Sequence, residues 1–262
     1  MARPCPCHTI HRGEPHRGED VEHLAHHVNW EEEKKRLMTN KDSQSEQQLK
    51  IPKIPKNGLA KGLPDEQVQD QARYAQLILS RENLVGQAAN HLSFDETLLQ
   101  YVRMSNTQFK KMQLLDSRLT TCDLANAEWA EAIFRRVELI DCQLTGFRAI
   151  EATIQDTLFK GCNSSFAQFR FATLKRVRFE HCDLSEVDFQ ETSLSDVTFI
   201  SCDLGNAEMS GAKLNRVDLR GSKIDGLRAG LNELKGAILD PGQALAFVRG
   251  MGIRVESPEK EL

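Results

Sequence analysis

Apolar side chains recur at every fifth position from Leu79 to Leu234, with Ser164 the one polar member, and no insertion or deletion interrupts the series. Its largest members are Phe94, Phe109, Trp129, Phe134, Phe159, Phe169, Phe179, Phe189 and Phe199. A small or β-branched residue stands two positions before most members, for example Ala127, Val137 and Val177. Residues two apart on a very short strand point to the same side, so both positions are predicted to face inward, with a corner after each pair.

The number of sides in each coil follows from a longer period. A period of five fits neither the 3.6 residues of a helical turn nor the alternation of an ordinary strand. The five cysteines of the repeat region are spaced by twenty residues, at Cys122, Cys142, Cys162, Cys182 and Cys202. A three-sided coil would repeat every fifteen residues, and such steps from Cys122 reach Val137, Ala152 and Ala167 instead of cysteines. Four sides per coil are therefore favoured. In this interpretation the cysteines are small packing residues, without a metal or redox role.

A second series of the same period consists of charged residues that alternate in sign. Its members are Asp116, Arg136, Asp156, Arg176, Asp196 and Arg216. If coils stack at about 4.8 Å, each charge is expected to lie between two opposite ones, at roughly 0.2 to 1 kcal/mol per pair. We therefore expect the loss of one member, as in Arg176→Ala, to cost about 1 kcal/mol or less.

Composition divides the chain into three parts. Residues 1–75 hold six of the eight histidines and most prolines, and are predicted to be a polar, poorly ordered or partly helical extension and linker. Residues 76–238 are the predicted β-helix, and residues 239–262 a capping and dimerisation helix with its tail. One alternative is that translation begins at Met38. Cys5, Cys7, His8 and His11 match no standard zinc spacing, so neither a metal nor a cofactor is expected.

Charge and hydropathy exclude several classes of protein. A net charge of −4 gives no basic footprint for direct nucleic-acid binding. No apolar run approaches the roughly 20 residues of a membrane span, and the first residues lack the apolar core of a signal peptide. A cytoplasmic location is expected. No nucleophile motif, phosphate loop or metal-spaced histidine pair occurs, and His181 falls at a corner without a partner base, so catalysis is not expected.

The repeat itself points to a family. The segments read CDLANAEW, CDLSEVDF, CDLGNAEM and GAKLNRVDL, and resemble the pentapeptide-repeat family over about 160 residues. The resemblance implies an all-β, right-handed quadrilateral β-helix. The tail GAILDPGQALAFVRGMGIRV resembles the C-terminal helix of the Qnr-type, quinolone-resistance members, and PKIPKN is similar to a segment of their Gram-positive relatives. That likeness implies binding to DNA gyrase or topoisomerase IV by partial imitation of DNA, and protection from quinolones.

Two features depart from that family pattern. The unbroken register leaves no room for the projecting loops of some Qnr-type members. Between residues 92 and 230 there are 20 acidic and 17 basic residues, whereas a DNA mimic is strongly acidic. The charge is segregated, however, because the half-coils 121–130 to 221–230 carry nine acids against four bases. The candidate partner-binding residues on that side are Asp123, Glu128, Asp141, Asp183, Glu186, Asp188, Asp203 and Glu208. A general interaction scaffold with another partner is the alternative.

The end of the chain predicts a homodimer. Asp240, Pro241 and Gln243 have the spacing of an N-cap, a first-position proline and a capping box for a helix of about ten residues. A helix so short is not stable alone, and the open end of the solenoid is an exposed strand edge. The expected dimer interface is apolar and consists of Leu245, Phe247 and Val248.

Overall fold

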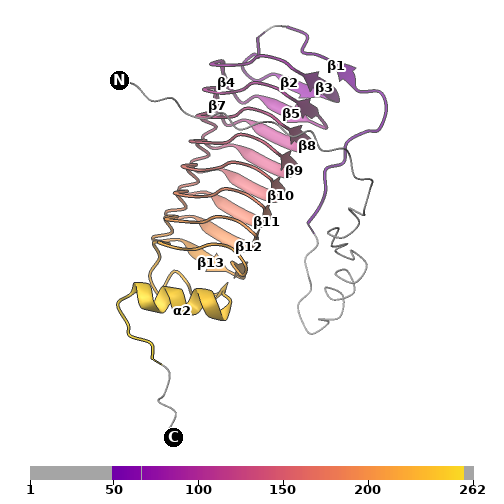
Figure 1. The fold of residues 1–262 in the computed structure, drawn as a ribbon. Coiled ribbons are helices and arrows are strands. Elements are labelled where there is room, and N and C mark those ends of the chain that lie inside the picture. Colours follow the sequence, from indigo (N-terminus) through magenta and orange to yellow (C-terminus); the bar gives the residue numbers. More distant parts are fainter. Residues whose placement is uncertain (1–48, 66, 257–262) are drawn as a thin grey trace, which may run out of the picture. The chain divides into compact units, whose positions relative to one another are not determined.

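The computed structural model describes residues 49–65 and 67–256. They form a β-solenoid of about nine turns, with one short helix lying across its C-terminal end (Figure 1). The predicted β-helix is therefore confirmed. The expectations for residues 1–48, including the cysteine and histidine cluster and the start at Met38, lie outside the described residues.

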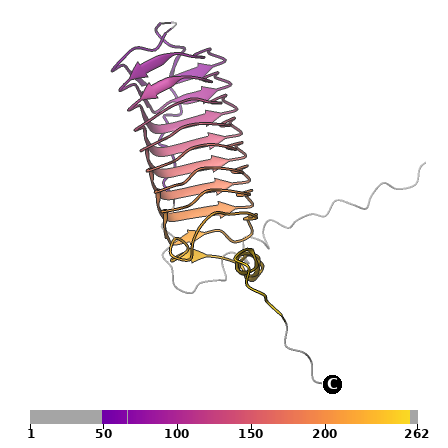
Figure 2. The same cartoon turned by 90° about the vertical axis from the view of Figure 1, so that its left-hand side faces the viewer.

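Strands are short at both ends of the solenoid and longer in the middle, where each continues around one corner (Figure 2). The first seven are β1 Ala60–Lys61, β2 Arg73–Ala75, β3 Leu77–Ser80, β4 Ala88–Asn90, β5 Ser93–Asp95, β6 Leu98–Gln100 and β7 Gln108–Lys110. The five long strands are β8 Gln113–Thr120, β9 Ile133–Ile140, β10 Thr153–Lys160, β11 Thr173–Glu180 and β12 Ser193–Ile200. The last are β13 Lys213–Asn215, β14 Val217–Asp218 and β15 Ala237–Ile238, followed by helix α2 Pro241–Gly250.

The pairing register confirms four sides per coil. Parallel partners stand twenty residues apart, as in Phe159↔Phe179 and Asp123↔Gln143. Each coil has four faces, and we name each face by the outward residue at its centre: face A at Asp123, face B at Glu128, face C at Ile133 and face D at Glu138. Residues twenty positions apart lie on the same face in adjacent coils. Faces C and D carry the long strands, whereas faces A and B are joined mainly by isolated bridges, with β4 and β7 paired at the N-terminal end of face B.

The predicted inward pairs form one continuous core. Phenylalanine rings stack from coil to coil, with centroids 4.7 Å apart for Phe159 and Phe179 and 5.0 Å apart for Phe179 and Phe199. Trp129 is buried, and its indole N–H donates to Thr107 Oγ1 at 3.0 Å. Cys122, Cys142, Cys162, Cys182 and Cys202 are all buried, as expected of packing residues.

The corners force an unusual backbone conformation on ordinary residues. At each corner, the residue two positions after the second inward residue has positive φ, for example Asn126 at 54° and His181 at 53°. Such conformations cost an L-residue roughly 1–2 kcal/mol. Each corner is compensated by the next coil, as where the Asn126 N–H donates to the Thr145 carbonyl at 2.9 Å. Regular stacking therefore holds the corners that isolated turns could not keep.

The alternating charges do not form the expected continuous series. Arg136 binds back to Asp116, Arg176 to Asp156 and Arg216 to Asp196, so the six residues form three separate ion pairs. In the middle pair, the Arg176 Nε and Nη2 groups donate to the two Asp156 oxygens at 2.6 and 2.8 Å. An arginine that donates to both oxygens of one carboxylate has its paired donors occupied, so it does not also bind the aspartate of the next coil.

The solenoid begins earlier than predicted at its N-terminal end and is capped by a helix at its C-terminal end. Strands β1 and β2 precede the expected boundary at residue 76, and Tyr74 already packs in the core. At the other end, Asp240 and Gln243 form the predicted capping box of α2. The buried Gln243 Nε2 also donates to the carbonyls of Leu219 at 2.6 Å and Ser222 at 2.7 Å. These bonds fasten the helix to the last coil.

Candidate partner-binding surface

The structure places the eight acidic candidates on two adjoining faces and their edges. Asp123, Asp183 and Asp203 are central on face A, and Glu128, Asp188 and Glu208 are central on face B. Glu186 lies at the corner between these faces, and Asp141 at the corner between faces D and A. The segregation of charge along the sequence thus becomes a segregation between sides of the solenoid.

The acidic residues form two groups, not one stripe. The stretch 161–170 carries no acid and separates Asp123, Glu128 and Asp141 from the other five. We call those five residues the C-terminal acidic patch: Asp183, Glu186, Asp188, Asp203 and Glu208. Within it, like charges stack in register, since Asp183 pairs with Asp203 and Asp188 with Glu208 in adjacent coils.

Half of the eight carboxylates have a basic partner. Their ion pairs are Glu128–Arg148 at 3.4 Å, Asp188–Arg170 at 3.7 Å, Asp203–Lys223 at 3.0 Å and Glu208–Arg228 at 3.7 Å. Within the described part of the chain, the other four have no ion pair within 4.0 Å. The surface is therefore less negative than the list of acids alone indicates.

Turn hydrogen bonds hold several of these carboxylates in fixed orientations. Asp183 Oδ1 accepts from the backbone N–H of Ser185 at 2.9 Å and from its hydroxyl at 2.6 Å. Burial raises the pKa of Asp203, but the N–H of Gly205 and the charge of Lys223 outweigh it, so this pKa falls below its ordinary value. Asp203 therefore stays ionised at neutral pH, and the turn hydrogen bonds hold the acceptor oxygens of Asp183 and Asp203 in place.

Two exposed aromatic residues flank face B next to the patch. Phe166 and Phe171 occupy consecutive corners, are 52% and 51% exposed, and both have a φ of 58°. The Arg170 guanidinium lies 5.5 Å from the centre of the Phe171 ring. A bulky residue at positive φ is uncommon, and half of each ring also faces water. Neither residue is among the candidates predicted from the sequence, although the five-residue register assigns both to outward corners.

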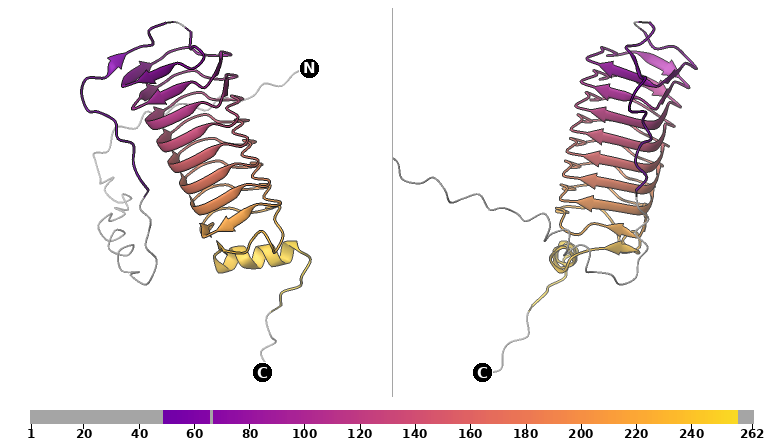
Figure 3. Two further views of the ribbon diagram at one scale, coloured as in Figure 1. Left: turned by 180° about the vertical axis from the view of Figure 1, so that it is seen from behind. Right: turned by 90° about the vertical axis from the view of Figure 1, so that its right-hand side faces the viewer.

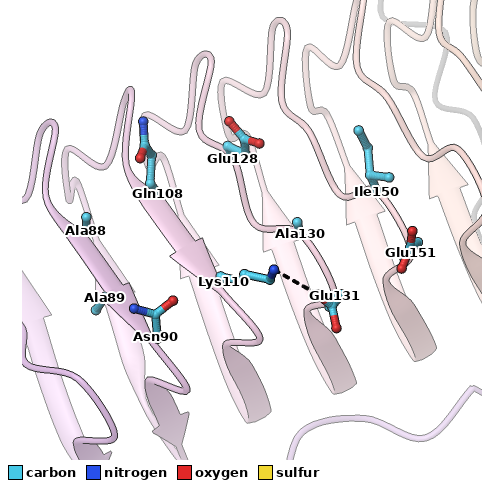
Figure 4. A pocket seen from close by; sticks show the side chains of 10 residues that line it. All are labelled: Ala88, Ala89, Asn90, Gln108, Lys110, Glu128, Ala130, Glu131, Ile150 and Glu151. Carbon is cyan, nitrogen blue, oxygen red and sulfur yellow. Dashed lines mark ion pairs between the residues drawn. The ribbon is translucent and has the colours of Figure 1, made fainter.

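A hollow of about 530 Å³ lies nearer the N-terminal end of the solenoid, over face B and its edge (Figure 4). Its lining includes Glu128, Glu131, Glu151 and Lys110, and Lys110 Nζ is 3.4 Å from a Glu131 oxygen. The small side chains of Ala88 and Ala130 leave the space open. Figure 4 shows the side chains projecting from successive coils without converging on one point, an arrangement that suits surface contact better than chemistry.

Other site chemistries find little support in residues 49–65 and 67–256. No group of three or more histidine, cysteine, aspartate or glutamate side chains in these residues could hold a metal ion. His181 is exposed at its corner. In the same residues, no helix has the length and apolar character needed to cross a bilayer.

The three expected dimer residues differ in accessibility. Leu245 is 37% exposed, whereas Phe247 and Val248 are half-buried. Gln243 is one helical turn before Phe247 and faces the last coil, so this side of α2 packs on its own solenoid. Of the three, Leu245 is therefore the most accessible for a contact with another molecule.

Comparisons with known proteins identify the family of the repeat. The profile of the pentapeptide repeat region matches residues 113–189 and 159–229. The uncharacterized protein YisX of Bacillus subtilis (strain 168) is 32% identical over 204 residues, covering 78% of this chain and 96% of YisX. The solenoid is also similar at 18% identity to QnrB1, a plasmid-mediated fluoroquinolone resistance protein, over 69% of this chain and 99% of that one, with a TM-score of 0.33. HetL, involved in heterocyst differentiation regulation in Nostoc sp. strain PCC 7120, gives 18% identity, coverage of 66% and 91%, and a TM-score of 0.35. The chain belongs to the pentapeptide repeat family.

Proposed function

We propose that this protein is a non-catalytic binding solenoid whose faces A and B dock onto a basic surface of another protein. The observation that carries the proposal is the stacking of Asp183 on Asp203 and of Asp188 on Glu208. Like charges directly opposite each other destabilise a sheet. Their placement is a cost to folding that a basic partner would relieve, and a fixed acidic surface also steers such a partner toward it.

The proposed partner is a bacterial type II topoisomerase, with DNA gyrase first and topoisomerase IV second. About nine turns at roughly 4.8 Å make a rod about 43 Å long, comparable with one turn of duplex DNA or slightly more. Carboxylates along two faces of such a rod offer negative charge where a DNA-binding saddle expects phosphates. Because four of the eight acids are already ion-paired, the imitation is partial, and the affinity should fall as salt rises.

A general interaction scaffold is the second candidate. Phe166 and Phe171 favour it, because half-exposed aromatic rings fit pockets on a protein partner and imitate nothing on DNA. The two candidates share the surface and differ in the partner, so one assay separates them.

The assay measures gyrase cleavage complexes formed with ciprofloxacin. Wild type should reduce them, and a variant with Asp183→Asn, Asp188→Asn and Asp203→Asn should need about tenfold more protein for the same effect. Asparagine keeps an Oδ1 acceptor for the turns, so the fold is expected to persist.

The matched control loses three acids from outside faces A and B: Asp95→Asn, Glu138→Gln and Asp218→Asn, each of which also pairs with an arginine. It should protect as wild type does. If wild type gives no protection, the scaffold alternative replaces the topoisomerase. If the patch variant protects as well as wild type, the partner stands and the patch is not its contact.

We also propose a homodimer formed through α2, with Leu245, Phe247 and Val248 at the contact. Leu245→Asp should convert a dimer into a monomer in light scattering, since it places a charge on the exposed side of the helix. Tyr101→Asp is the control, because it changes another exposed large side chain on a distant coil and should leave the dimer mass unchanged. A wild-type protein of monomer mass would remove the proposal.

A further inference from the structure

Two phenylalanines stand at corners of a kind that mostly carries polar side chains. Phe166 and Phe171 both have a φ of 58° and are about half exposed. Among the other described residues with positive φ, those that are not glycine are polar or charged, apart from Tyr101. Glycine and asparagine adopt this conformation most readily, and folding gains little from a ring that faces water. The two rings are therefore candidate anchors for a contact with another molecule.

Each ring has carboxylates beside it. Figure 3 shows the coils stacked in one column, so corner residues twenty positions apart form rows along its length. In these rows Phe166 precedes Glu186, and Phe171 stands between Glu151 and Glu191. All three glutamates are exposed, and none of them has an ion pair within the described chain. The surface around the rings is therefore apolar and negative at once.

One of the rings is held from the side. The Arg170 guanidinium lies 5.5 Å from the centre of the Phe171 ring. Its Nε is 3.7 Å from Asp188 Oδ2 in the next coil. A ring that is held in this way loses less conformational freedom when it binds a partner, which makes it a better anchor.

The spacing of the two corners suits a helix. Face B lies between them and spans about three extended residues, roughly 10 Å. An α-helix with its side chains is about 10–12 Å across. Rings at both edges of face B would therefore flank a helix that lies along the length of the solenoid.

The hollow over face B extends this surface toward the N-terminal end. Its lining includes Glu151, the neighbour of Phe171 in the corner row, and the apolar side chains of Ala88, Ala130 and Ile150. The coil of Phe171 is four coils beyond that of Ala88. Four coil steps rise about 19 Å, which is the length of a helix of about thirteen residues. We call the surface from the hollow to the two rings the aromatic groove.

We propose that the aromatic groove binds an amphipathic helix of a partner protein, with an apolar stripe between the rings and lysine or arginine on its flanks. The inference rests on the proposed function, because it names the element with which a basic partner meets face B. Charge complementarity selects this occupant, since exposed glutamates border the apolar anchors and would repel nucleic acid. Helix α2 of a second copy fits poorly, because Arg249 is its one basic residue.

Fluorescence anisotropy with labelled synthetic peptides tests the inference on the full-length protein. The probe has about fourteen residues, with leucine along one helical stripe and lysine and alanine elsewhere. A second peptide has the same composition with its leucines scattered around the helix, and a third carries a central proline, which breaks a helix. Wild type should bind the probe about tenfold more tightly than either control peptide. Equal binding of the three peptides overturns the proposal.

The anchors are tested one at a time. Phe166→Ala and Phe171→Ala should each weaken binding of the probe about tenfold, because each removes one side of the apolar contact. Tyr101→Ala is the matched control, since it removes a corner aromatic that is 54% exposed in a different row. Its affinity should stay within about twofold of wild type. If it weakens binding as much as the phenylalanine variants do, the peptide binds elsewhere and the proposal is wrong.

The charge beside the rings is tested with Glu186→Gln. It should weaken binding of the probe about threefold and make the affinity less dependent on salt. Glu96→Gln is the control, because it makes the same change at a corner of nearly the same φ, 53° against 55°, between faces C and D. Equal effects of the two changes would show that the probe follows the overall charge of the protein, which contradicts the assigned groove.

The outcomes separate this inference from the proposed function. If wild type binds the probe but gives no protection in the gyrase assay, the topoisomerase is removed and the aromatic groove stands. If wild type protects gyrase but does not prefer the probe to its control peptides, the groove is removed and the topoisomerase stands. A lower oligomer mass of Phe166→Ala in light scattering would assign the rings to a second copy of this chain and overturn the proposal.

Discussion

Replacing Phe179 with alanine should lower the free energy of unfolding by about 3–5 kcal/mol. Its side chain is fully buried and stacks between Phe159 and Phe199, while its edge meets Phe189 at 6.4 Å. The core is one layer of rings per coil, with backbone on all four sides. Because the surrounding coils are fixed by their register, little can relax inward to fill the space that the ring leaves.

Phe171→Ala is the matched control, because it removes the same side chain from a corner where it is 51% exposed. It should change the free energy of unfolding by roughly 0.5 kcal/mol or less. Urea unfolding, followed by circular dichroism, measures both variants. Similar losses for the two would show that the assignment of inward and outward positions is wrong.

The fold could be predicted from sequence to the level of register. One inward pair every five residues fixes which side chains face the core, and the cysteines spaced by twenty fix how many pairs close a coil. The helix cap at the C-terminal end could also be predicted, because Asp240 and Gln243 have the spacing of a capping box. Such inferences succeed because each depends on neighbours in sequence or on a strict period.

Contacts that depend on side-chain conformation could not be read in this way. The charged series predicts a continuous run, but whether Arg136 turns back to Asp116 or forward to Asp156 is decided by rotamers. The acidic candidates look alike in sequence, yet Asp203 is paired and Asp183 is not paired with any base in the described chain. The hydrogen bond from the Lys53 N–H to Asp116 joins residues more than sixty positions apart, which no period reveals.

Arg176→Ala should lower the free energy of unfolding by about 1.5–3 kcal/mol, more than the sequence alone suggests. From the sequence, Arg176 is expected to be a surface residue, whereas its side chain is 13% exposed and that of its partner Asp156 is 1% exposed. Removing the arginine leaves a buried carboxylate that still accepts a hydrogen bond from Gln155 Nε2 at 3.1 Å but has lost its charged partner. A buried charge that loses its partner is costly because water cannot reach it.

Arg216→Ala provides the comparison, since it breaks the same kind of pair where the arginine is 54% exposed. It should cost less than about 1 kcal/mol. Chemical denaturation at pH 7 measures both variants. Equal costs would mean that burial does not strengthen the Asp156–Arg176 pair relative to the exposed one.

The pH dependence of the Arg176→Ala effect separates charge from packing. Burial raises the pKa of Asp156, but hydrogen bonding and charge from Arg176 outweigh it, so the folded-state pKa lies below the ordinary 3.8. A lowered carboxyl pKa stabilises the fold above the unfolded-state value, and this stabilisation is lost as pH falls through the folded-state value. The difference in unfolding free energy between wild type and Arg176→Ala should therefore be constant from pH 7 to about 5 and shrink below about 4. A difference that persists undiminished at pH 2 would assign the effect to the packing of the arginine stem and not to its charge.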